Sequence, residues 1–128
     1  MTRIPIPAQI MSAVRCAVLA ELGNAAADIE QSSVGCNMEN RPEDYGALLE
    51  EFDTVRALLD AVGWSDAEGA IDVERHRRPL LSALENWLRN DRYFVADPAT
   101  SPASREETER EIDGIEGFLS ATGLNGGQ

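Results

Sequence analysis

Hydrophobic side chains recur at intervals of three and four residues in four segments of the chain, which is the spacing of one face of an α-helix. These segments lie near residues 7–31, 42–62, 72–95 and 104–122. No strand-like alternation of apolar and polar residues extends over four or more positions between turn signals. The pattern therefore predicts an all-α fold, an antiparallel four-helix bundle formed by a single domain over residues 1–128.

Residues with strong positional preferences mark the ends of the second helix. Asn40 and Glu43 have the spacing of a capping box, and Pro42 suits the first turn. Gly63 is a typical C-terminal stop because glycine adopts the left-handed conformation at little cost. We expect the segment before this helix, residues 32–41, to form a loop.

The ends of the third and fourth helices are marked in the same way. Asp72 can cap the third helix, and Pro79 either kinks this helix or marks its true first turn. Residues 97–103 read as a turn-rich linker, after which Ser104 and Glu107 offer a second capping box. Gly123 is expected to end the fourth helix, and residues 124–128 to form a loose tail.

Composition places this domain among small acidic proteins. The net charge is −12, from 23 acidic residues against 11 arginines and no lysine. Such acidity argues against direct nucleic-acid binding and against an anionic membrane surface, since both require a basic face. It is compatible with a protein partner. Arginine without lysine, beside abundant alanine, is typical of a bacterial chain from a GC-rich genome.

The cysteines and the N-terminal segment favour the cytoplasm. Cys16 and Cys36 are expected to be reduced thiols, with a single bridge or a reactive Cys36 as alternatives. The apolar stretch 4–22 is interrupted by prolines and by Arg15, which argues against a membrane span or a signal peptide.

The first helix is unusual because the side opposite its apolar stripe is not charged. That side holds small residues where a surface helix is normally polar. Two interpretations follow: the helix is central and buried all round, or its small-residue face packs against a second copy or another protein. On the second interpretation the partner or oligomer interface comprises Ser12, Ala13, Cys16, Ala20 and Ala27.

Trp64 follows the second helix and has two interpretations. It either covers the end of the bundle or joins the same interface as an exposed anchor.

A cationic segment stands out in the third helix. Arg75, His76, Arg77 and Arg78 form either an anion site at the start of this helix or internal pairs with the acidic helices. Asp91 lies on the apolar stripe, where an unpaired carboxylate is costly, so it is included in a possible anion or ligand site with the cationic segment.

No sequence motif indicates catalysis. A lone histidine and two separated cysteines do not form an ordinary metal site, and no nucleotide-binding or hydrolase motif is present, so we predict no catalytic residues, no metal and no cofactor. The favoured function is a non-catalytic interaction module, such as an adaptor, an antitoxin or immunity protein, or a regulatory subunit, that binds through the charge-poor first helix, its acidic face or both, with a homodimer plausible. The alternatives are a DNA mimic that uses the acidic fourth helix and a small-molecule or enzymatic bundle that uses the Arg/His/Asp cluster.

Overall fold

The computed structural model describes residues 3–34, 42–63 and 70–124. The elements in these ranges are β1 (Arg3–Pro5), α1 (Ala8–Val34), α3 (Pro42–Val62), β2 (Ala70–Asp72), α4 (Val73–Ala96) and α5 (Pro102–Thr122). The prediction of an all-α, four-helix protein is confirmed, with the addition of one short two-stranded sheet.

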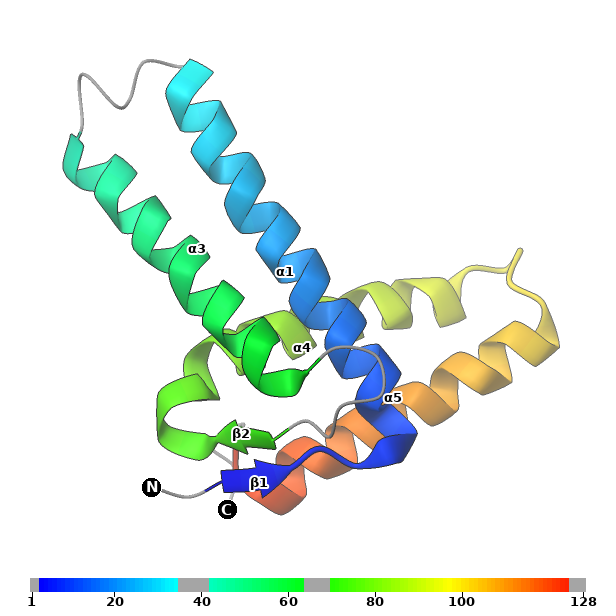
Figure 1. Ribbon diagram of the computed structural model, residues 1–128. Coiled ribbons are helices and arrows are strands. Elements are labelled where there is room, and N and C mark those ends of the chain that lie inside the picture. The colour runs from blue at the N-terminus through cyan, green and yellow to red at the C-terminus, as the bar shows by residue number, and fades with distance from the viewer. Residues whose placement is uncertain (1–2, 35–41, 64–69, 125–128) are drawn as a thin grey trace.

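The helices form two hairpin-like pairs that cross one another. Figure 1 shows α1 beside α3 and α4 beside α5, with the members of each pair running in opposite directions. The pairs do not share one axis, because the N-terminal half of α1 lies across α4 and α5. As a result α1 contacts each of the other three helices, while its C-terminal half extends away from α4 and α5 with α3 alongside.

The hydrophobic core lies where the two pairs cross. The apolar stripe of α1 meets the C-terminal half of α3, the middle of α4 and the C-terminal half of α5 in one cluster. Side chains with no solvent exposure in this cluster include Val14, Val18, Leu58, Leu84 and Ile115. The predicted stripe of α3 is buried only toward its C-terminal end, since Leu49 is 41% exposed. The core is thus concentrated at the crossing and not spread along four aligned helices.

The short sheet closes the core beside the start of α4. β1 and β2 pair antiparallel, with Arg3 opposite Asp72 and Ile4 opposite Ile71. Ile71 is fully buried, so this strand pair covers one side of the helices. Sequence periodicity missed both strands because three residues are too few to establish an alternating pattern.

Local sequence signals predicted the start of α4 correctly and the start of α5 incorrectly. Asp72 caps α4, where its Oδ1 accepts the backbone N–H groups of Glu74 at 3.0 Å and Arg75 at 3.2 Å, as predicted. The predicted cap of α5 at Ser104 is wrong: the cap is Ser101, which precedes Pro102 in the first turn. A proline at the first position is preorganised for the helix, and this preference outweighed the capping box.

Glycines end α3 and α5 as predicted. Gly63 and Gly123 have φ values of 83° and 69°, in the left-handed region. The prediction of a loose tail is wrong at its first residue, since Leu124 is fully buried in the core. Pro79 lies inside α4 and not in its first turn. The helix α1 continues through Gly23 to Val34, so the predicted loop begins too early; Asn40, Cys36 and the rest of residues 35–41 lie outside the described residues.

The close approach of α5 to α1 depends on Gly114. A Cβ atom at Gly114 would lie 2.8 Å from Cγ2 of Ile10, whereas a Cβ at Gly117 on the same helix would meet nothing within 4 Å. Ile10 is buried, and its Cγ2 is attached directly to Cβ, so it has little freedom to move away. Gly114 therefore sets how closely these two helices pack.

We expect alanine substitutions at these two glycines to have opposite effects on the free energy of unfolding. Gly117→Ala should raise it by about 0.5–1 kcal/mol through helix propensity. Gly114→Ala should lower it, because the added methyl group overpacks the contact with Ile10. The free energies of unfolding of the two variants should then differ by about 2 kcal/mol. Urea denaturation of the two proteins measures this difference, and equal stabilities would contradict the proposed close approach.

Candidate functional site

The outward face of α1 is exposed along most of the helix. Ser12, Cys16, Ala20 and Ala27, which were predicted as interface residues, are all exposed, as is Gly23 between them. This exposure excludes the interpretation of α1 as a helix buried all round. Ala13 is a correction, since it is 7% exposed and faces the core. Trp64 lies outside the described residues.

This face carries no charge between residues 8 and 27, because both charged side chains in that range are engaged with other elements. The Nε of Arg15 donates to the backbone oxygen of Val62 at 3.3 Å. The carboxylate of Glu21 accepts hydrogen bonds from the side chains of Ser82 and Asn86 on α4. What remains outward is uncharged and mostly small or apolar: it includes Leu19, which is 46% exposed, and the polar side chains of Gln9 and Asn24.

The length and hydropathy of α1 also match those of a membrane-crossing helix. Residues 8–31 have a mean hydropathy of 1.3 over their most apolar window, and 33% of that window is buried. Core helices and signal sequences meet the same criteria, so this match alone does not assign a membrane location. The predicted location in the cytoplasm stays a prediction.

The cationic segment of α4 is mostly paired within the molecule. The Nη1 of Arg77 donates to the backbone oxygens of Gly123 at 2.8 Å and Leu124 at 3.3 Å, where it satisfies the C-terminal end of α5. Arg78 forms a bidentate pair with Glu51 on α3. Arg75 is exposed at the surface. These contacts support internal pairing for Arg77 and Arg78.

His76 is buried and belongs to the junction between β2 and α4. Its Nδ1 accepts the backbone N–H of Asp72 at 3.0 Å, which requires a neutral ring with the proton on Nε2. Burial lowers the pKa of His76, and the neighbouring Arg75 lowers it further. The N–H groups of Arg75 and Glu74 lower the pKa of Asp72. Asp72 occupies two of the N–H groups that an anion would use. Arg75 and His76 also line a hollow of about 310 Å³ together with Arg3.

Asp91 does not join the cationic segment. It lies 14 positions after Arg77, about 21 Å along the helix axis, and meets Glu111 of α5 instead. Its Oδ2 is buried and accepts no hydrogen bond among the described residues. Burial, followed by the contact with Glu111, raises the pKa of Asp91 to about 7. Trp87 packs against the core and donates its Nε1 proton to Glu111 at 3.1 Å.

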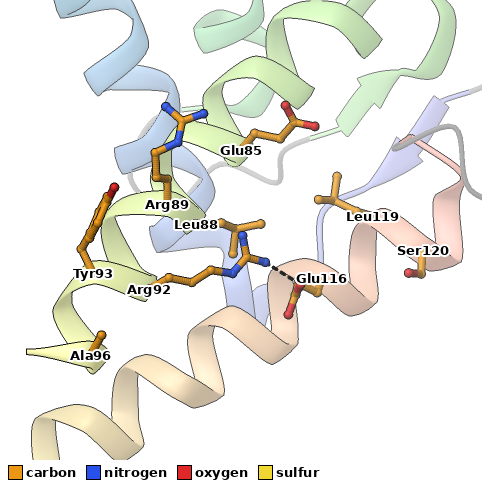
Figure 2. A pocket seen from close by; sticks show the side chains of 9 residues that line it. All are labelled: Glu85, Leu88, Arg89, Arg92, Tyr93, Ala96, Glu116, Leu119 and Ser120. Carbon is orange, nitrogen blue, oxygen red and sulfur yellow. Dashed lines mark hydrogen bonds and ion pairs between the residues drawn. The ribbon is translucent and has the colours of Figure 1, made fainter.

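A groove of about 720 Å³ lies between α4 and α5. Figure 2 shows Leu88 at its centre, the aromatic ring of Tyr93 at one side, and Arg92 reaching across to Glu116. The Arg92–Glu116 pair joins the two helices at 2.6 Å. Hydrophobic periodicity could not reveal this groove, because the groove depends on which faces of two helices meet. None of the residues of the predicted ligand site lines it.

The acidic side chains of α5 have different roles. Glu111 faces α4, Glu116 binds Arg92, and Glu106 pairs with Arg110 at 3.4 Å. Glu107, Glu109 and Asp113 remain exposed and unpaired among the described residues. The continuous acidic face that the sequence indicated is therefore reduced to a few free carboxylates.

Comparison with known proteins does not assign this chain to a family. No protein-family model, curated protein or solved structure matches it. Within residues 3–34, 42–63 and 70–124, no group of three or more potential ligands is placed to hold a metal ion. The outward face of α1 is thus the surface that most needs a functional explanation.

We expect His76 to make folding sensitive to acid. Below its ordinary pKa of 6.5 the unfolded histidine takes up a proton that the folded one does not, so stability is complete above this pH and is lost as the pH falls. His76→Asn keeps an acceptor for the Asp72 N–H but does not titrate. Urea denaturation from pH 7.5 to 5.5 should show wild type losing stability relative to the variant; parallel profiles would contradict this role.

Proposed function

We propose that this protein is a non-catalytic protein–protein interaction module that binds through the outward face of α1. The observation that carries the proposal is an exposed helical face without charge between residues 8 and 27, on a chain with a net charge of −12. A solvent-facing helix normally carries polar and charged residues there. An adaptor, an antitoxin or immunity protein, and a regulatory subunit all fit this description.

Electrostatics favours this face over the rest of the surface for contact with a second copy. Two copies of an acidic protein repel one another, and the repulsion is weakest where the facing surfaces carry no charge. Small side chains such as Ala20 and Gly23 also let a partner helix approach closely. A homodimer that joins two such faces about a twofold axis satisfies both conditions.

The size of the face sets the expected strength of association. From residue 8 to residue 27 the helix spans about 30 Å, and at a width of about 10 Å the face offers on the order of 300 Å². Stable interfaces bury about 800 Å² on each partner. We therefore expect a weak, micromolar association for α1 alone.

The other two functions have weaker support. A DNA mimic needs an array of free carboxylates, and several of those on α5 are paired internally. A small-molecule site at the Arg/His/Asp cluster needs Arg77 and Asp91 close together, and α4 separates them. The groove beside Arg92 offers a different location for a small ligand, but its arginine and glutamate neutralise one another. The cytoplasmic location, bacterial origin and lack of catalysis remain part of the proposal.

A single charge on this face should weaken the association. We expect wild-type protein to dimerise at micromolar concentrations and Ala20→Glu to raise the dimer dissociation constant at least tenfold, because a carboxylate would be buried against a partner. Sedimentation equilibrium measures both constants. Glutamate is a good helix former, so the fold should be retained.

Ala103→Glu is the matched control. Ala103 is exposed on α5, away from the outward face of α1, and the substitution changes the net charge by the same amount. Its dimer dissociation constant should stay close to that of the wild type. Wild-type protein that remains monomeric at high micromolar concentration, and that retains no partner on a column, would overturn the proposal.

A further inference from the structure

We propose that a proton shared between Asp91 and Glu111 acts as a pH-sensitive latch between α4 and α5. When the proton is present the two carboxyl groups hold the helices together. When it leaves, two carboxylates face one another across the same interface and weaken it. This device is independent of the outward face of α1.

The placement of Asp91 and Glu111 favours a shared proton. Trp87 and Asp91 lie one turn apart on the same face of α4, and the indole N–H of Trp87 donates to Glu111 Oε2 at 3.1 Å, which places the Glu111 carboxylate at this turn of α4. A hydrogen bond between the two carboxyl groups requires that one of them carries the proton. Asp91 Oδ2 is buried without a hydrogen-bond donor, which is costly for an ionised carboxylate. Asp91 is therefore the natural site of the proton, and Glu111 the acceptor.

The nearby arginines are engaged elsewhere. Arg92 on α4 binds Glu116, Arg110 on α5 pairs with Glu106, and Arg105 donates to the backbone oxygens of Val95, Asp97 and Thr100.

The helix α1, which also packs against α4 and α5, supplies no cation to this pair. On α1, Arg15 is bound to the Val62 carbonyl and Glu21 to Ser82 and Asn86. Of the charged groups in the described residues, Glu111 is the one that shifts the pKa of Asp91.

Loss of the shared proton changes the charge of the Asp91–Glu111 pair by one unit. The protonated Asp91 donates to the Glu111 carboxylate, and on deprotonation the proton passes to solvent, the hydrogen bond is lost and the pair goes from one negative charge to two. A carboxyl whose folded pKa lies near 7, above its unfolded value, stabilises the fold most at low pH. That contribution is lost as the pH rises from 3.8 toward 7.

Urea denaturation of wild type and Asp91→Asn across pH 5 to 8 tests the latch. The ratio of their unfolding constants removes the opposing contribution of His76, which both proteins contain. The wild-type constant should rise relative to that of the variant by up to about tenfold between pH 5 and 6, and the ratio should level off above pH 7. Asp113→Asn, an exposed change on α5, should give a flat ratio.

Carbon-13 NMR of the Asp91 carboxyl measures its titration midpoint in the wild-type protein, so this test does not depend on a folded variant. We expect its titration midpoint close to neutrality, and a lower midpoint in Glu111→Gln, where the second carboxylate is absent. A wild-type midpoint near 4, or a ratio of unfolding constants that does not change with pH, would overturn the proposal. A midpoint that falls on adding magnesium chloride but not on adding sodium chloride of the same ionic strength would also overturn it, because the pair would then hold a cation in place of the proton.

Discussion

The packing of one face of α1 against the other three helices is the contact on which this structure depends. Val14 and Val18 lie fully buried at the crossing of the two helical pairs, and Ile10 extends the contact to Gly114 on α5. The two charged side chains of α1 between residues 8 and 27, Arg15 and Glu21, are both engaged with neighbouring elements. The outward face of α1 therefore carries no charge over this range. The helix that contributes Val14 and Val18 to the core thus also carries the candidate interaction surface.

Signals that act within one or two helical turns were readable from the sequence. The apolar stripes located the four helices, Asp72 marked the start of α4, and Gly63 and Gly123 marked two helix ends. Each of these depends on neighbours only a few residues away, such as the N–H groups that Asp72 accepts. The cap of α5 shows the limit of such reasoning, since two plausible serines competed and the proline beside Ser101 decided between them.

Features that depend on pairs of distant elements could not be read in this way. The strands are too short to show periodicity, and they form only because β1 pairs with β2, which is distant in the sequence. Asp91 was recognised as unusual for its position on an apolar stripe, but its partner Glu111 looked like one more residue of an acidic surface. The cationic segment left an anion site and internal pairing open, and the contact of Arg77 with the end of α5 favours pairing for that residue. Exposure of the small-residue face of α1 likewise required the packing of all four helices.

The two ends of α4 place opposite demands on pH. His76 near its N-terminus must be neutral to accept the Asp72 N–H, whereas Asp91 toward its C-terminus must be protonated to donate to Glu111. Below pH 6.5 the two contributions change in opposite directions and offset one another, while above it only that of Asp91 continues to fall. A rise in pH toward 6.5 therefore strengthens the contact at the N-terminal end of α4 and weakens the one toward its C-terminal end.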